Sequence, residues 1–485
     1  MRPALPAVCC AILLVLAGCS VGYGGPDAEP AAPTPTSPTQ TPTAVPTPTG
    51  SGTPTATASA PATATTSPTP TFPEPTATAI ATPTPRDRQG SPDGSGVLDG
   101  LLDGDDEETI AVQGGELPLD PGLVYDRTTR LLGTDVPGPD TIQLLDTTAN
   151  TTSPPEFQRL LGLERNVTEA EAIAFVVGPR TVYANRNLAD RPAFLEHVLA
   201  HEFTHTVQFR RGYIGRVTAA TGSDPDGRFT STAVIEGAAT YTEDRYWLAY
   251  VVDRAAPGER PARGVERRYR NSDGAARYSF APYWFGYRYA AATVDSPAEL
   301  PEVYADPPLT SEQVLHPGTD EGPVPLRVAL RGETAGVWQE TFAPPRGRIG
   351  EAFLRVALAT ELGDDRAARA AAGWGNDTRI AFNNETGARG YAWVLRFDDA
   401  ANASEFDTAV TAYLSERTGD APLADDRTGR QWTTTLDGRP VAYRLRRTDD
   451  RTAVLLLGTP AFVDADTTTV RGADGRVVIE TDGEG

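Results

Sequence analysis

The stretch HEFTHTVQ, residues 201–208, contains the residue types best suited to chemistry in this chain. On an α-helix, residues four apart lie one turn apart on the same face, so the imidazoles of His201 and His205 can bind one metal ion. Glu202 follows the first histidine, where its carboxylate can reach a water molecule on that ion without being a ligand. The spacing is typical of zinc hydrolases, and we expect Glu202 to act as the general base.

A catalytic zinc ion needs a third protein ligand and one open position. Cysteine is excluded, because the three cysteines all lie within the first 19 residues. Glu236 is the preferred candidate, since a carboxylate in the apolar helical segment AVIEGAATYTED needs a cation or another partner. Two alternatives stay open. Glu236 is also explained as a helix-start glutamate favoured by the helix dipole, and Glu243 or Asp244 can be the ligand instead.

Hydrolysis of an amide also needs a donor for the developing oxyanion. His316 is the only histidine outside the stretch 197–205, and we expect it to fill this role, with three tyrosines as alternatives: Tyr241, Tyr283 and Tyr287. A surface histidine beside Pro317 is an equally simple explanation of His316. His197 lies one turn before His201 and is interpreted as a buried or supporting histidine, not a ligand.

Local patterns predict the elements that position these residues. A mostly buried helix begins near Pro192 and runs through residue 211. Alternating apolar residues predict strands within 172–185, and the strand at 180–185 is expected to be the sheet edge beside the metal helix, or an ordinary strand of the same sheet. Residues 251–280 are rich in Arg, Gly and Pro and predict a long mobile loop.

The N-terminal segment predicts export. Residues 1–19 combine Arg2, an apolar run and the sequence LAGC, which resembles a lipobox that would place a lipid on Cys19 and anchor the chain to the outer membrane surface. An ordinary signal peptide is the alternative. Residues 20–110 contain a Pro- and Thr-rich tract and an acidic, Gly-rich stretch, and these predict a disordered stalk and linker. We therefore expect an extracellular, cell-surface lipoprotein.

The composition restricts the partners. The net charge is −22 with 65 acidic residues against 43 basic ones, and this excess argues against nucleic acid as a ligand. Every basic residue among those 43 is arginine, and the chain has a single methionine. The combination is typical of halophilic archaea, where molar salt screens carboxylate repulsion. Sequons compatible with a glycosylated exterior begin at Asn150, Asn166, Asn376, Asn384 and Asn402.

The remaining chain divides into three predicted parts. Residues 111–372 carry the metal-site candidates, residues 373–463 alternate strands with a helix as in a small α+β domain, and residues 464–485 are expected to form a frayed acidic tail. We expect the protein to be a monomer.

HEFTHTVQ followed by IEGAATY resembles the gluzincin class of zinc metallopeptidases over about 50 residues, and PYWFGYRYA and LTSEQVLHP resemble segments of secreted haloarchaeal members. The resemblance implies an α+β fold, with a mostly helical zincin-like catalytic domain and a small sheet. It also implies a zinc cofactor and a peptide or protein substrate. One departure is Thr240, which occupies the position where gluzincins usually carry an acid that orients a zinc histidine; Glu243 and Glu196 are possible substitutes. A non-catalytic surface binding or adhesion protein on the same scaffold is the alternative function, and hydrolysis of a non-peptide amide is a third.

Overall fold

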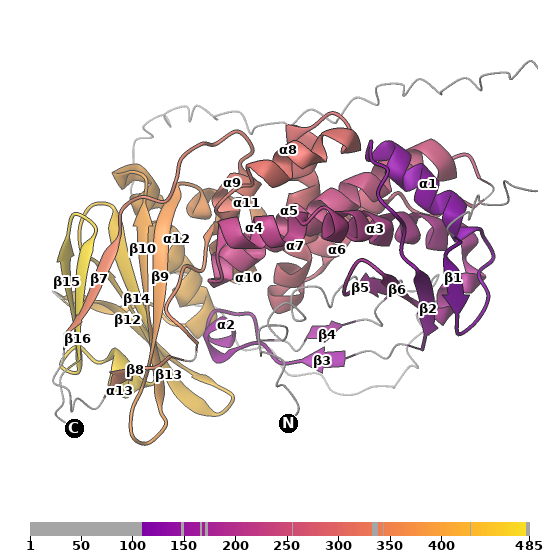
Figure 1. The fold of residues 1–485 in the computed structure, drawn as a ribbon. Helices are drawn as coiled ribbons and strands as arrows, with labels where there is room; N and C mark the ends of the chain where they lie inside the picture. The colour runs from indigo at the N-terminus through magenta and orange to yellow at the C-terminus, as the bar shows by residue number, and fades with distance from the viewer. Residues whose placement is uncertain are drawn as a thin grey trace, which may run out of the picture. The chain divides into compact units, whose positions relative to one another are not determined.

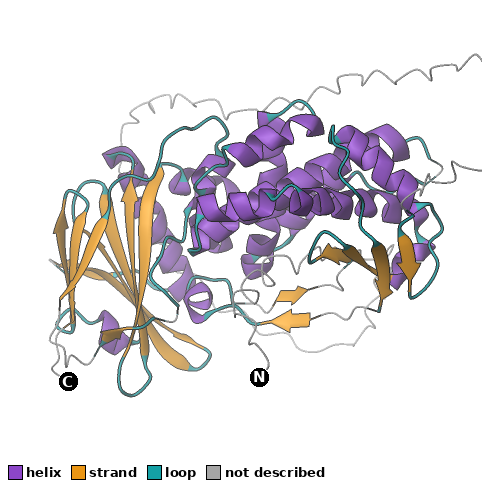
Figure 2. Cartoon of the chain, in the orientation of Figure 1, coloured by secondary structure: helices purple, strands orange, loops and turns teal. Residues whose placement is uncertain are grey.

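The computed structural model describes residues 109–146, 150–164, 167–169, 173–254, 256–331, 338–342, 344–426 and 428–481. Cys19 and the expected signal peptide and stalk therefore lie outside the described residues, except for the last two residues of the linker. The fold is mixed α+β with several sheets, as expected (Figures 1 and 2). Among the described residues, no helix has both the length and the apolar character needed to cross a bilayer.

A four-stranded sheet precedes the metal-site helices. Its strand order is β1-β2-β6-β5, with β1, β2 and β6 parallel and β5 antiparallel to β6. The expected strand at 180–185 is present as β6. Of its two expected placements, the ordinary strand within the sheet is correct and the sheet edge is wrong, because β2 and β5 pair with its two sides. The edge strand on that side is β5. The bounds are β1 Ala111–Gln113, β2 Thr141–Leu145, β5 Ala174–Val176 and β6 Thr181–Asn185, with α1 Pro121–Leu131 between β1 and β2.

A group of helices follows, and it contains both parts of the candidate metal site. Helix α3 packs against α5, and α5 packs against α7. The bounds are α3 Pro192–Arg210, α4 Tyr213–Thr221, α5 Pro225–Tyr246, α6 Pro261–Asn271, α7 Gly274–Thr293, α8 Leu300–Ala305 and α9 Ser311–Leu315. Shorter elements are the pair β3 Asn150–Thr152 and β4 Val167–Glu169, helix α2 Glu156–Leu160, the turns η1 Arg186–Asp190 and η3 Pro297–Glu299, and the π-helical turn η2 Trp247–Val251.

The expectation of a long loop at 251–280 was wrong for most of that segment. Helix α6 and the start of α7 occupy it, and only residues 252–260 connect η2 to α6. Ala262, Val265 and Tyr269 are buried at helical spacing, while the arginines face outward. The high arginine content marks one solvated face of an amphipathic helix.

Glycine permits the close approach of α5 and α7. A Cβ added to Gly237 would lie 2.2 Å from the backbone of Gly286, and a Cβ on Gly286 would lie 2.0 Å from the carbonyl oxygen of Ala233. These separations are far below any real carbon contact, so only glycine fits at this crossing. The crossing supports the segment of α5 that carries Glu236.

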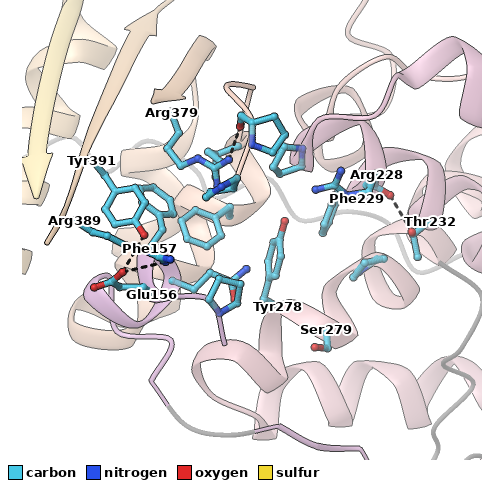
Figure 3. Close-up of a pocket in the computed structure, with 18 residues that line it drawn as sticks. Glu156, Phe157, Arg228, Phe229, Thr232, Tyr278, Ser279, Arg379, Arg389 and Tyr391 are labelled. Carbon is cyan, nitrogen blue, oxygen red and sulfur yellow. Dashed lines mark hydrogen bonds and ion pairs between the residues drawn. The ribbon is translucent and has the colours of Figure 1, made fainter. Parts of the chain in front are cut away.

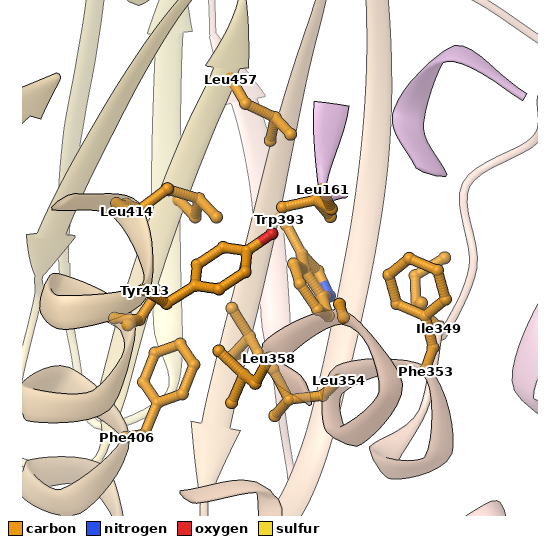
Figure 4. Packing of buried hydrophobic residues seen from close by; sticks show 14 of the residues in the cluster. Leu161, Ile349, Phe353, Leu354, Leu358, Trp393, Phe406, Tyr413, Leu414 and Leu457 are labelled. Atoms are coloured by element: carbon orange, nitrogen blue, oxygen red, sulfur yellow. The ribbon is translucent and has the colours of Figure 1, made fainter. Parts of the chain in front are cut away.

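A seven-stranded antiparallel sheet forms the C-terminal part, in the order β11-β12-β13-β14-β10-β9-β8. Helices α10, α11 and α12 pack together beside it, and Figure 4 shows the core that they share with the sheet, including Phe353, Trp393, Phe406 and Tyr413. The bounds are β8 Gln339–Glu340, α10 Glu351–Leu362, α11 Asp364–Ala371, β9 Trp374–Asn383, β10 Arg389–Phe397, α12 Ala400–Thr418, β11 Leu423–Asp426, β12 Gly429–Leu436, β13 Arg439–Arg447 and β14 Thr452–Gly458. The expected boundary at 372 thus falls inside one continuous core, because α10 and α11 pack with the sheet.

The expectation of a frayed tail from residue 464 was also wrong. After helix α13 Pro460–Val463, strands β15 Thr468–Ala473 and β16 Arg476–Thr481 form a three-stranded sheet with β7 Arg327–Arg331. Val470 on β15 and Val477 and Ile479 on β16 enter a core that contains Phe462, whereas the neighbouring Arg471, Val478 and Glu480 are more exposed. Of the described acidic residues, Asp464, Asp466 and Asp474 lie outside the two strands, and Glu480 on β16 pairs with Arg471.

The glycine crossing generates a stability test. Gly237→Ala should lower the free energy of unfolding by about 1–3 kcal/mol, because the methyl group overlaps the α7 backbone. Gly215→Ala is the matched control, since nothing lies within 4 Å of a Cβ on this residue of α4, and it should be neutral or stabilise by up to about 1 kcal/mol. Denaturant unfolding in molar salt measures both values. Equal stability of the two variants would contradict the close packing.

Candidate metal centre

Helices α3 and α5 lie side by side (Figure 1), and their packing brings His201, His205 and Glu236 together. The Nε2 atoms of the two histidines lie 3.2 Å apart. Glu236 Oε2 lies 3.3 Å from the Nε2 of His201 and 3.4 Å from that of His205. All three residues are buried. The three atoms therefore form a nearly equilateral triangle inside the protein.

This triangle has the dimensions that zinc requires. Ligand atoms at about 2.0–2.1 Å from a tetrahedral zinc ion lie roughly 3.3–3.4 Å from one another. The donor set of two imidazole nitrogens and one carboxylate oxygen is also one that zinc prefers. The geometry and the chemistry of the donors thus fit this cofactor, with three protein positions supplied and a fourth position left for water.

Glu243 occupies the far side of His201. Its carboxylate lies 3.1 Å from His201 Nδ1 and 2.7 Å from His197 Nδ1. Of the two substitutes proposed for the missing acid at Thr240, Glu243 therefore contacts a candidate ligand, and it lies seven residues after Glu236 on the same face of α5. A carboxylate here holds the proton on His201 Nδ1 and leaves Nε2 free to bind a metal.

The other proposed residues have different surroundings. Glu196 accepts hydrogen bonds from Arg127, Arg254 and Tyr246, so its carboxylate is used away from the three ligands. Thr240 is buried, and within the described part of the chain its hydroxyl has no hydrogen-bond partner. The alternative ligand Asp244 accepts two hydrogen bonds from Arg260 at 2.9 and 2.7 Å.

Gln208 was not singled out by the sequence patterns, although it fixes the state of His205. Its Nε2 group donates to the carbonyl oxygen of Ile235 at 3.0 Å and to Tyr304 Oη at 2.9 Å. The amide oxygen must then face His205 Nδ1, 2.7 Å away. That oxygen can only accept, so His205 carries its proton on Nδ1 and presents a lone pair at Nε2. The i, i+3 spacing from His205 on a buried helix is the signal that would have identified it.

In this cluster, the carboxylates of Glu236 and Glu243 face histidine imidazoles, which shift the pKa of both carboxylates. Burial alone would raise the pKa of Glu236, but the imidazoles of His205 and His201 outweigh burial and hold it below its usual range. Burial likewise opposes ionisation of Glu243, and hydrogen bonds from His197 and His201 lower its pKa to about 2. Burial would lower the pKa of His205, yet Glu236 raises it. Both glutamates are therefore ionised and available to a cation at neutral pH.

Glu202 lies on α3 directly after His201 and is fully buried, with 0% of its surface exposed. The apolar faces of α3 and its neighbours surround the segment, since residues 194–208 of this helix are all buried. Its carboxylate is thus excluded from bulk water, which strengthens its electrostatic interactions.

The structure does not bring His316 into this group. Its Nε2 lies 2.9 and 3.1 Å from the carboxylate oxygens of Glu351 on α10. Among the alternative oxyanion donors, Tyr241 donates to the carbonyl oxygen of Val294 and Tyr287 donates to Asp244. His316, whose side chain is 39% exposed, therefore pairs the end of α9 with a buried carboxylate on α10.

Comparison with known proteins informs only the C-terminal part. Residues 340–468 match a family described as a domain of unknown function (DUF8575). This segment runs from the end of β8 to the start of β15 and contains none of the three candidate ligands. No curated protein and no solved structure matches the chain.

The role of Gln208 can be tested by metal affinity. Gln208→Leu should weaken zinc binding by about 10- to 100-fold, because His205 loses the acceptor that orients its ring and selects its tautomer. Tyr304→Phe is the control, since it removes one partner of the amide but leaves the bond to Ile235 that sets its orientation. Competition with a chelator measures both affinities. Unchanged zinc binding by folded Gln208→Leu would contradict the proposed tautomer.

Proposed function

We propose that this protein is a zinc-dependent metallopeptidase of the gluzincin type. The observation that carries the proposal is the buried triangle of His201, His205 and Glu236, whose spacing matches tetrahedral zinc. Glu243 and Gln208 behind the two histidines add support, because they hold both imidazoles ready for metal binding. The four-stranded sheet and the two helices that bear the ligands fit the zincin-like architecture that the resemblance implies.

The residues divide the chemistry between them. His201, His205 and Glu236 would hold the zinc ion, which supplies Lewis acidity to the scissile carbonyl and makes a water molecule more acidic. Glu202 accepts a proton from the attacking water and transfers it to the leaving amine nitrogen. Its burial keeps the proton between these two partners and away from bulk solvent.

Strand β5 is the proposed binding edge for the substrate backbone. It pairs with β6 on one side only among the described residues, and α3 packs against it. An extended peptide can add to such an edge through main-chain hydrogen bonds, which hold it regardless of its side chains. A peptide or protein substrate bound to this edge would lie beside the helix that carries Glu202. In this proposal β5 is the substrate-binding edge, in place of the strand β6 that the sequence suggested for that role.

The proposed location rests on the N-terminal sequence. A lipid on Cys19 would anchor the protein to the outside of the membrane, and the Pro- and Thr-rich stalk would hold the peptidase away from the envelope. The acidic, lysine-free composition fits action in high salt. We propose that the enzyme acts as a monomer on extracellular peptides or proteins.

The burial of the site favours a second candidate, a surface binding or adhesion protein in which the zinc ion is structural. Glu202 is fully buried, and the residues that line the two described cavities include none of the three ligands. A structural zinc ion is enclosed by protein, whereas a catalytic one must admit substrate.

One experiment separates the two candidates. The purified protein should contain about one zinc ion per chain, and Glu202→Gln should keep the metal while cleavage of an unfolded protein falls by about 10²- to 10⁴-fold. Glu266→Gln is the control, because Glu266 pairs with arginines on the surface of α6. Full cleavage activity in Glu202→Gln would show that Glu202 is not the general base. A zinc-loaded wild-type protein that cleaves nothing would favour the structural metal.

A further inference from the structure

A cavity of about 610 Å³ lies apart from the candidate metal centre (Figure 3). The beginning of α5 and the first half of α7 form one side, and α2, α10 and strands β9 and β10 form the other. Its volume is within the range of small-molecule sites in proteins. No role in the proposed peptidase reaction accounts for it.

Flat apolar surfaces dominate the walls. Phe229 stacks on Tyr278 with ring centres 5.7 Å apart and an interplanar angle of 24°. Phe157 stacks on Phe353 at 5.7 Å and 25°. Prolines fill much of the remaining wall: Pro155, Pro225, Pro282, Pro344 and Pro345. Rings and prolines lose little freedom on binding, so the cavity is preorganised for a planar apolar group.

A buried cation, Arg379, lies at the same cavity. Arg379 on β9 is only 7% exposed, and it forms no ion pair within the described residues. Its Nη2 group donates a hydrogen bond to the carbonyl oxygen of Pro345 at 2.7 Å, and its guanidinium lies over the ring of Phe157. Its Nε group has no hydrogen-bond partner among the described residues. A buried, incompletely paired charge is costly, and a bound anion would remove that cost.

Two further polar groups face the same space. Arg228 on α5 adds a second positive charge, and the described residues provide it with a carbonyl partner at Ser223 but no carboxylate. Burial lowers the pKa of Arg379 and the charge of Arg228 acts in the same direction, whereas Tyr391 and the buried carboxylate of Asp377 oppose this shift. The hydroxyl of Tyr278 has no partner within the described residues. Figure 3 shows Arg379, Arg228 and Tyr278 directed toward the space between them.

Arg389 provides an internal contrast. It lines the same cavity, but Glu156 lies 3.5 Å from its guanidinium, and Glu156 also accepts a hydrogen bond from Tyr391. Its charge is therefore already balanced by the protein. Among the described residues, no carboxylate lies within ion-pair distance of the buried Arg379 or the exposed Arg228, in a chain whose net charge is −22.

We propose that this cavity binds an organic anion in which a carboxylate is attached to a planar apolar group. Arg379 and Arg228 bind the carboxylate, with Tyr278 donating a further hydrogen bond. The planar group lies against the aromatic walls formed by Phe229 and Phe157. This function does not depend on zinc, because none of these residues is a candidate metal ligand.

Calorimetric titration with benzoate tests the proposal at one fixed salt concentration. Benzoate should bind with one site per chain. Benzamide, which lacks the charge, and acetate, which lacks the ring, should each bind at least about tenfold more weakly, since a charge-assisted hydrogen bond contributes about 1.5–3 kcal/mol. Equal binding of benzamide or acetate would overturn the proposed ligand class.

Variants locate the binding site. Arg379→Gln and Arg228→Gln should each weaken benzoate binding about tenfold or more, whereas Arg389→Gln should leave it within about twofold of the wild type because Arg389 is already paired. Tyr278→Phe keeps the ring and tests the site without altering a charge. Undiminished binding by folded Arg379→Gln and Tyr278→Phe would overturn the assignment. Glu202→Gln should bind benzoate normally, so loss of peptidase activity and loss of this site are distinguishable.

Discussion

The packing of α3 against α5 is the contact on which the rest of the structure depends. It buries the imidazoles of His201 and His205 and the carboxylate of Glu236 in one place, which a protein interior tolerates only when each polar atom has a partner. Gln208 contacts His205 at Nδ1, and Glu243 contacts His201 at Nδ1. The Nε2 atoms of the two histidines therefore converge with one carboxylate oxygen of Glu236. A divalent cation is the partner that balances this arrangement most completely.

Helix α5 connects this contact to the other parts of the molecule. Gly237, next to Glu236, allows α7 to approach α5 closely, so the candidate metal ligand lies on a helix that packs against neighbours on two sides. Seven residues before Glu236, Phe229 lines the cavity, about 10 Å away along the helix axis. Helix α5 therefore carries a candidate metal ligand near its middle and part of the cavity wall near its beginning. A displacement of α5 would alter both.

The local patterns predicted elements well and their partners poorly. The helix that carries His201 and His205 and the strands β5 and β6 were expected where they occur, because hydrophobic period and turn residues act over a few neighbours. The edge position of β6 was wrong, because strand order is decided by pairing with the distant strand β2. The loop expected at 251–280 and the acidic tail after 464 were wrong for one shared reason. Arginine and acidic residues dominate the composition of both segments. A few apolar residues at helical or strand spacing nevertheless give each segment regular structure packed on a core.

The sequence by itself determined the chemistry offered by α3, since four-residue spacing on any helix places His201 and His205 on one face with Glu202 beside them. It also identified Glu236, because a carboxylate in an apolar helix needs a partner. Only the tertiary structure decided that Glu236 reaches both histidines, that Glu243 and not Thr240 supports His201, and that His316 pairs with Glu351 instead of joining the group. These contacts join residues that are 31 to 42 positions apart in the chain. The crossing angle and the register of the packed helices determine such contacts, and the local spacing of residues encodes neither.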